Sequence, residues 1–144
     1  MTAVDTNILV YAHRLESPWH DSAAATLREL AEGISPWAIP WPCVHEFVAV
    51  VTNARIFRTP TPLRRALDDV DVWLESPSLR MLGEPDLYWS HFREVATRGA
   101  VSGAMVHDGR VAAICRAHGV SELLTADRDF SRFGSLKVRN PLAV

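Results

Sequence analysis

The sequence has few of the residues that characterise disulfide-bonded or membrane-spanning proteins. Its only two cysteines, Cys43 and Cys115, are far apart and lie in apolar helical contexts. Their number and spacing indicate neither a disulfide framework nor a zinc site, so we expect buried thiols in a reducing compartment. No apolar run approaches the ~20 residues of a membrane span. The first apolar run has no basic leader and contains Asp5, so we expect no signal peptide, no membrane association and a cytoplasmic location.

Neither sign of charge dominates. The 15 basic and 17 acidic residues give a formal net charge of -2, which alone does not indicate a nucleic-acid partner. A metal-dependent nucleic-acid enzyme can still be mildly acidic, because bound ions reverse the field around its carboxylates. The composition, 48% hydrophobic and 22% charged, is typical of a folded globular protein. At 144 residues we expect one domain spanning residues 1–144.

A short apolar run near the C-terminus ends in two aspartates. Leu123 and Leu124 predict a buried parallel strand that Thr125 closes, and Asp127 and Asp129 follow. In open α/β sheets, ligands bind at the carboxyl ends of the strands. Asp127 is therefore expected at a ligand-binding edge, where it needs acidic partners from elsewhere in the chain.

The N-terminus repeats this pattern. Ala3 and Val4 predict a very short strand that ends at Asp5, and a helix from about Ile8 follows. Thr6 or Asn7 can cap that helix. Asp5 can also cap it, but its place after an apolar strand makes it a candidate partner of Asp127.

Strands and helices alternate along the rest of the chain. We expect further strands at 36–40, 79–82 and 136–139, and helices at 21–32, from 41 onward, at 63–75, 86–98 and 107–118, with a one-turn helix at 131–133. Residues 100–106 are small and predict a loop near a site. This order predicts a three-layer α/β fold with a parallel sheet.

Two more acids are expected early in helices. Glu46 is set among apolar residues and Asp108 follows His107 at a helix start. A favourable interaction with the helix dipole accounts for Glu46 nearly as well as a functional role does. For Asp108 considered alone, a role as N-cap is the better explanation than a functional role. The six histidines show no paired acid–base spacing.

The two strand-end acids and the two helix acids can all reach one edge of the sheet. Two carboxylates at ~4 Å repel by about 1 to 4 kcal/mol, so such a group either shares protons or holds a divalent cation. Ligands that are all oxygen favour Mg²⁺ or Mn²⁺ over zinc.

Along essentially its whole length the chain resembles the PIN-domain family of metal-dependent ribonucleases and, more closely, the VapC toxins of bacterial toxin–antitoxin pairs. The motifs that carry the resemblance are Val4-Asp5-Thr6-Asn7, Glu46, His107-Asp108 and Leu124-Thr125-Ala126-Asp127-Arg128-Asp129-Phe130. The resemblance implies a sheet of about five strands in the order 3-2-1-4-5, with two of the acids on adjacent central strands.

The resemblance also implies roles for these residues. The catalytic acids that coordinate Mg²⁺ or Mn²⁺ are Asp5, Glu46, Asp108 and Asp127. Asp129 matches a further acid, which is a direct ligand, a ligand through water or a cap of the Phe130 turn. The small polar residues that orient carboxylates or water are Thr6, Asn7 and Thr125. Gly109 departs from the alanine common in the family, and we expect it to loosen the start of its helix.

The implied activity is that of an endoribonuclease toxin. Metal-activated water attacks a phosphodiester of single-stranded or looped RNA in line and leaves 5′-phosphate and 3′-hydroxyl ends. The implied partners are a VapB-type antitoxin and a second copy of the chain. From their positions, the arginines predicted to bind flanking RNA phosphates are Arg14, Arg55, Arg58, Arg110 and Arg128.

Two alternatives remain. A PIN-like binding module would hold metal or antitoxin without cutting RNA, although the complete set of four acids argues against a degenerate domain. A phosphotransfer enzyme would use Asp5 as its nucleophile, but such enzymes usually have a second aspartate two residues on, where this chain has Asn7.

Overall fold

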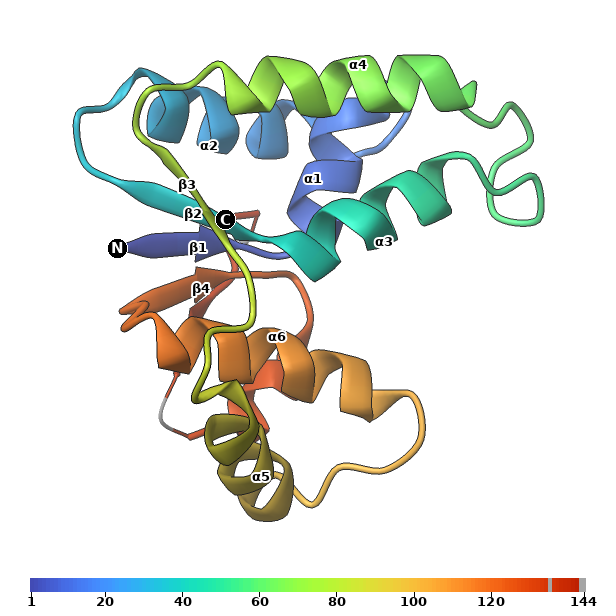
Figure 1. The fold of residues 1–144 in the computed structure, drawn as a ribbon. Coiled ribbons are helices and arrows are strands. Elements are labelled where there is room, and N and C mark those ends of the chain that lie inside the picture. The colour runs from blue at the N-terminus through green and yellow to red at the C-terminus, as the bar shows by residue number, and fades with distance from the viewer. Residues whose placement is uncertain (135, 143–144) are drawn as a thin grey trace.

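The protein is built on a five-stranded parallel sheet (Figure 1). The computed structural model describes residues 1–134 and 136–142. The strands are β1 (Thr2–Val4), β2 (Trp37–Pro40), β3 (Leu79–Leu82), β4 (Glu122–Leu124) and β5 (Lys137–Arg139). They lie in the order β3-β2-β1-β4-β5, and all four neighbouring pairs are parallel. The predicted strand order is confirmed.

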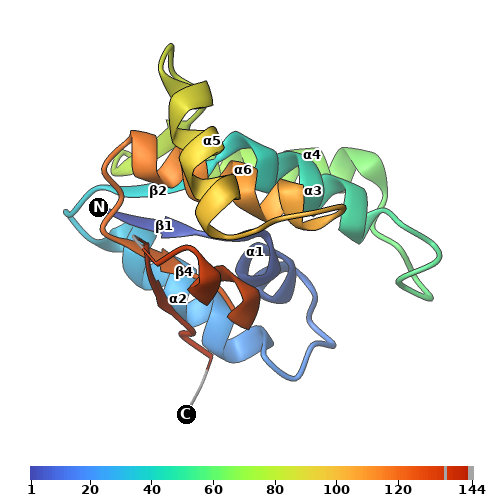
Figure 2. The same ribbon diagram turned by 90° about the horizontal axis from the view of Figure 1, so that it is seen from below.

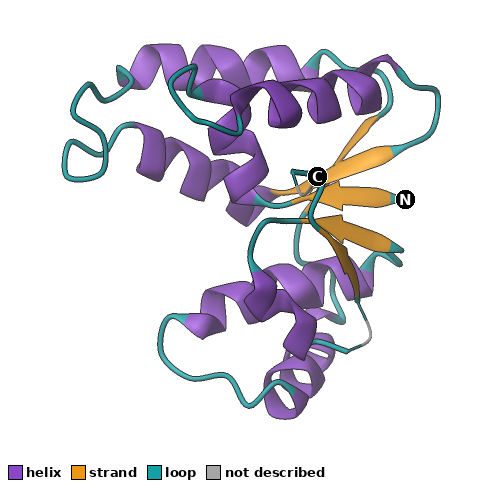
Figure 3. Ribbon diagram, turned by 180° about the vertical axis from the view of Figure 1, so that it is seen from behind, coloured by secondary structure: helices purple, strands orange, loops and turns teal. Residues whose placement is uncertain are grey.

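Helices cover the sheet on both faces, as the views in Figures 2 and 3 show. They are α1 (Thr6–His13), α2 (His20–Glu32), α3 (Trp41–Val51), α4 (Leu63–Leu74), α5 (Tyr88–Arg98) and α6 (Met105–Ala117), and a 3₁₀ helix, η1, spans Arg128–Arg132. In Figure 2, α2 lies on one side of β1 and α6 on the other. The three-layer α/β/α architecture is therefore confirmed. Within the described residues, no helix has both the length and the apolar character that crossing a membrane requires.

The central strands are short and almost completely buried. Val4 and Leu124 are paired across β1 and β4 and are no more than 1% exposed. This pairing puts the carboxyl ends of the two strands side by side, with Asp5 directly after one and Thr125 directly after the other. Cys43 and Cys115 are buried free thiols, as predicted.

Helix starts differ from the predictions. α1 begins at Thr6, so Thr6 and Asn7 lie inside the helix and neither caps it. Asp5 occupies the N-cap position without a capping hydrogen bond from its side chain. These three polar side chains are therefore available for contacts with the rest of the site.

α6 begins at Met105, two residues before the predicted start, with Ala104 at its N-cap. Asp108 therefore lies in the first turn and is not the cap. Gly109 directly follows Asp108 inside the helix and is buried against Phe92 and Val101, and its loosening of the helix start stays a prediction. In the same way, η1 begins at Arg128 and not at the predicted Ser131.

Candidate active site

Four carboxylates line one cavity of about 300 Å³, which we call the acidic cavity. They come from four segments: the residue after β1, α3, α6 and the loop after β4. These carboxylates belong to Asp5, Glu46, Asp108 and Asp127. The structure thus brings the four predicted acids together. Asp129 is exposed and does not line this cavity, and its backbone N–H donates to Asp127 Oδ1 at 2.8 Å.

Glu46 lies in a different environment from the one expected. It is exposed, in the second turn of α3, and not set among core residues. Its Oε2 accepts a hydrogen bond of 3.1 Å from the Thr6 hydroxyl. Thr6 therefore joins α1 to the carboxylate on α3 and fixes the direction of that carboxylate.

Asp5 is the most constrained of the four acids and is only 6% exposed. Its Oδ2 accepts a hydrogen bond of 2.8 Å from the Thr125 hydroxyl and one of 3.4 Å from Asn7 Nδ2. Its Oδ1 accepts a weak bond of 3.5 Å from the Cys43 thiol. Both oxygens are thus held in place from three elements of the fold.

Asn7 and Thr125 tie the ends of β1 and β4 together. Asn7 Nδ2 donates to Thr125 Oγ1 at 3.1 Å, and Asn7 Oδ1 accepts from the Ala126 backbone N–H at 3.1 Å. Thr125 Oγ1 also accepts from the backbone N–H of Asp127 at 3.0 Å. These bonds set the distance between the two strand-end acids, which is consistent with the predicted orienting role of Asn7 and Thr125.

The electrostatics of the acidic cavity are unfavourable for the carboxylates. Burial, with a contribution from nearby Glu46, raises the pKa of Asp5 from 3.8 to about 6, although the Thr125 hydrogen bond opposes the shift. Burial also raises the pKa of Asp108 to about 6, followed by the charges of Asp127, Asp5 and other acids. No lysine, arginine or histidine of the described chain lines the cavity, so its negative charge is not compensated by the protein.

The chemistry of this donor set fits a hard divalent cation. Every ligand candidate that lines the cavity is an oxygen, as Mg²⁺ and Mn²⁺ prefer, and no described histidine or cysteine lines it. As the side chains are placed, no three acidic, histidine or cysteine groups within residues 1–134 and 136–142 are close enough to hold an ion together. The fit of the site to a divalent cation therefore rests on the chemistry of its oxygen donors and not on a preformed coordination shell.

The five arginines predicted to bind RNA phosphates do not line the acidic cavity. Arg110 pairs with Glu84 at 2.5 Å on the surface. Three others are exposed and form no ion pair among the described residues: Arg55, Arg58 and Arg128. Arg14 is largely buried and already paired, as described below.

Sequence reasoning missed the apolar wall of the cavity. Tyr11, Ile56 and Phe57 line it together with the acids. The position of Tyr11 was readable, because it follows Asn7 by four residues and so shares one face of α1 with it. The other two residues lie in the connection between α3 and α4, where no periodic pattern places side chains.

Comparison with known proteins agrees with this architecture. A family model described as "PIN domain" matches residues 2–136. A VapC ribonuclease of Mycobacterium bovis, Mb2897, is 35% identical over 142 residues, which cover 99% of this chain and 96% of the relative. Ribonuclease VapC48 of Mycobacterium tuberculosis is 28% identical, with 96% of each chain covered.

Solved structures show the same fold. VapC20 of Mycobacterium tuberculosis, described as a sarcin-ricin loop cleaving toxin, superposes with a TM-score of 0.69 at 20% identity, covering 97% of this chain and all of that one. The VapBC2 structure from Rickettsia felis gives a TM-score of 0.70 at 22% identity, covering 96% of this chain and 97% of its match. The acidic cavity, the strand order and these relatives lead to one assignment: the chain belongs to the PIN-domain family and groups with the VapC proteins in it.

Proposed function

We propose that the chain is an endoribonuclease toxin that uses Mg²⁺ or Mn²⁺ in the acidic cavity to hydrolyse single-stranded or looped RNA. One observation carries the proposal: four carboxylates converge on one cavity that no cationic side chain of the described residues lines. A protein that keeps such uncompensated charge needs a cation to complete the site. The ribonuclease relatives support the same reaction class.

Each part of the site has a role in this proposal. Asp5, Glu46, Asp108 and Asp127 hold the ion, and Asn7 and Thr125 keep the strand-end acids in register. A divalent cation held by these acids would supply the activation of a water molecule for in-line attack and would neutralise charge that develops on the phosphate. The products carry 5′-phosphate and 3′-hydroxyl ends. A role for Asp129 as an additional ligand stays a prediction.

The expected substrate and partners follow from the same reading. Unpaired RNA can enter the cavity with a flexible backbone, whereas a stiff duplex cannot. A VapB-type antitoxin and a second copy of the chain are the proposed protein partners. Among the structures with this fold, VapBC2 from Rickettsia felis was solved with a DNA fragment from its promoter. The cytoplasmic location stays a prediction.

The two alternatives fit the structure less well. A binding module could hold metal or antitoxin with the same four acids, but the complete set of acids and the ribonuclease relatives favour a catalytic domain. A phosphotransfer enzyme would need an acid at the position of Asn7, whose amide is instead used to join the ends of β1 and β4. The nuclease reading explains both features.

The test compares the purified protein with Asp5→Asn and, as a matched control, Asp68→Asn, which changes an exposed aspartate on α4. Total cellular RNA is incubated with Mg²⁺, Mn²⁺ or EDTA, and new 5′ ends are sequenced. We expect discrete 5′-phosphate ends with wild type and Asp68→Asn. Cleavage should fall by about 10³-fold or more in Asp5→Asn, equivalent to about 4 kcal/mol of transition-state stabilisation, and disappear in EDTA. Identical behaviour of all three proteins in every metal would establish the binding-module alternative instead.

A further inference from the structure

A second and larger cavity, of about 640 Å³, adjoins the acidic cavity. We call it the basic cavity, because its charged lining consists of three arginines and one acid: Arg14, Arg58, Arg65 and Glu16. Ile56 and Phe57 line both cavities. The two spaces therefore share a wall, with negative charge on one side and positive charge on the other.

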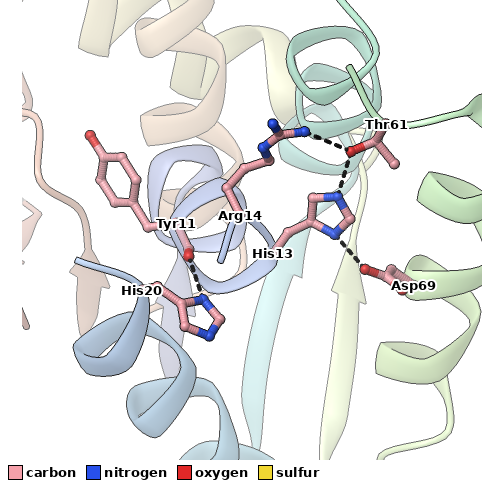
Figure 4. A network of polar contacts seen from close by, with 6 residues as sticks. All are labelled: Tyr11, His13, Arg14, His20, Thr61 and Asp69. Carbon is pink, nitrogen blue, oxygen red and sulfur yellow. Dashed lines mark hydrogen bonds and ion pairs between the residues drawn. The ribbon is translucent and has the colours of Figure 1, made fainter. Parts of the chain in front are cut away.

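Three residues that line the basic cavity, His13, Arg14 and Thr61, belong to a hydrogen-bond network that Figure 4 shows. His13 is 5% exposed; its Nδ1 contacts Asp69 Oδ2 at 2.5 Å and its Nε2 contacts Thr61 Oγ1 at 2.7 Å. Thr61 Oγ1 also accepts from an Arg14 guanidinium nitrogen at 3.2 Å. A neutral imidazole satisfies every atom: Nδ1–H donates to Asp69, the Thr61 hydroxyl donates to Nε2, and Thr61 accepts from Arg14.

The order of Asp69, His13 and Thr61 is that of a nucleophile with its base, but the environment argues against this chemistry. Thr61 is 7% exposed, and its oxygen is already the acceptor for Arg14. A nucleophile needs an accessible oxygen beside its reaction partner. The network instead joins the end of α1 to α4 and to the connection before it, and so holds the wall between the two cavities in place.

The three arginines differ in how far they are already paired. Arg14 forms an ion pair with Glu16, donates to Thr61 and lies over the Phe57 ring at 4.1 Å from its centre. Arg58 and Arg65 are exposed and have no ion-pair partner among the residues that the structure describes. Arg14 is therefore part of the wall, and the other two are available to a ligand.

We propose that the basic cavity binds a phosphodiester of the RNA strand next to the one that is cut, with Arg58 and Arg65 contacting its oxygens. The inference rests on the proposed function. An RNA strand with one phosphate in the acidic cavity carries further phosphates on either side of it. A bound cation neutralises only the phosphate beside it, and the carboxylates repel the others. The neighbouring backbone therefore needs a cationic site. The basic cavity supplies it across the shared wall, and the arginine fork matches phosphate geometry.

The test measures binding separately from cleavage. Wild type, Arg58→Ala/Arg65→Ala and Arg28→Ala/Arg93→Ala are titrated into a short fluorescent single-stranded RNA in EDTA, and anisotropy is followed over a salt series. The control removes the same charge from two exposed arginines on α2 and α5, which line neither cavity and form no ion pair among the described residues. We expect about tenfold weaker binding for the first double variant and a salt slope lower by about 0.7, since the variant loses its contact with one phosphate of a single strand. The control should change little.

Two readouts separate this inference from the proposed function. In cleavage assays with Mg²⁺ or Mn²⁺, the Arg58/Arg65 variant should raise KM and leave kcat close to wild type, and Arg58→Lys/Arg65→Lys should recover part of the loss. If wild type cleaves RNA and the alanine variant binds and cleaves equally well, the inference is wrong and the proposed function stands. If wild type binds RNA through these arginines but cuts nothing, the nuclease proposal fails and the phosphate site stands. Loss of binding to an acidic peptide, with RNA binding unchanged, would overturn the inference in favour of a protein ligand.

Discussion

The two cavities on either side of Ile56 and Phe57 differ in how completely the fold satisfies their polar groups. In the basic cavity, each ring nitrogen of His13 has a partner and the guanidinium of Arg14 is paired. In the acidic cavity, two of the four carboxylates have a pKa raised to about 6. The network beside the basic cavity is therefore complete within the protein, whereas the charge of the acidic cavity is left for a ligand to balance.

This difference has a consequence for stability. Hydrogen bonding is not what the acidic cavity lacks, because no buried side-chain nitrogen or oxygen among the described residues is without a partner. Only charge is unbalanced there. Strained charge of this kind is common at functional sites and lowers the stability of the unliganded protein. Removing charge from the acidic cavity should therefore stabilise the metal-free protein, and breaking the network under the basic cavity should destabilise it.

Asp5→Asn gives the largest expected effect on stability. The folded pKa of Asp5 is raised from 3.8 to about 6, so the metal-free folded protein holds a proton that the unfolded chain has lost between these values. Stability therefore falls as pH rises through this window. The variant should match wild type below pH 3.8 and exceed it above pH 6, by up to about 3 kcal/mol. Thermal unfolding in EDTA across this pH range measures the difference.

Asparagine suits this test because its shape and most of its contacts are those of aspartate. Its oxygen can still accept from Thr125, while its amide nitrogen faces the Cys43 sulfur, a weak acceptor. Mg²⁺ provides the complementary arm, since it should raise the unfolding temperature of wild type and not of the variant. A variant no more stable than wild type at neutral pH would show that burial of this carboxylate has no net penalty.

Thr125→Val sharpens the comparison from within the acidic cavity. Thr125 is 1% exposed, and valine has nearly its shape but lacks the hydroxyl that donates to Asp5 and accepts from Asn7. We expect about 10- to 100-fold weaker Mg²⁺ binding, measured as the midpoint of a metal titration followed by thermal shift and by RNA cleavage. Thr125→Ser keeps the hydroxyl and should retain most of the affinity. Equal losses in the two variants would assign the effect to packing and not to the hydrogen bonds.

The sequence alone predicted those parts of the site that follow from local patterns. Asp5 and Asp127 were found because each follows a short apolar run, and the alternation of elements predicted a parallel sheet. The strand order came from the resemblance to PIN domains. The starts of α1 and α6 were each misplaced by two residues, and side-chain caps offered no guide, since none of the six α-helices has a side-chain capping hydrogen bond among the described residues.

Residues joined only by the tertiary fold could not be predicted. Asp69 and Thr61 contact His13 from 56 and 48 residues away along the chain. No periodicity relates such positions, so His13 could not be told from an ordinary packing residue. The exposure of Glu46 was misjudged for a similar reason: its apolar neighbours face the core, but its own direction depends on where α1 places Thr6.

Asp69→Ala breaks the network on the other side of the wall and should have the opposite sign to Asp5→Asn. The substitution leaves the buried Nδ1–H of His13 without its acceptor, which costs about 1 to 3 kcal/mol. Asp68→Ala removes an exposed carboxylate from the neighbouring position of α4 and should have little effect. Urea unfolding at pH 7 measures both, and a lower midpoint with an unchanged slope is expected for Asp69→Ala alone.

Because Asp69 does not line the acidic cavity, Mg²⁺ should stabilise this variant as much as it stabilises wild type. If the two alanine variants unfold at the same urea concentration, the network adds nothing to stability, and the contrast between the satisfied network and the uncompensated acidic cavity does not hold.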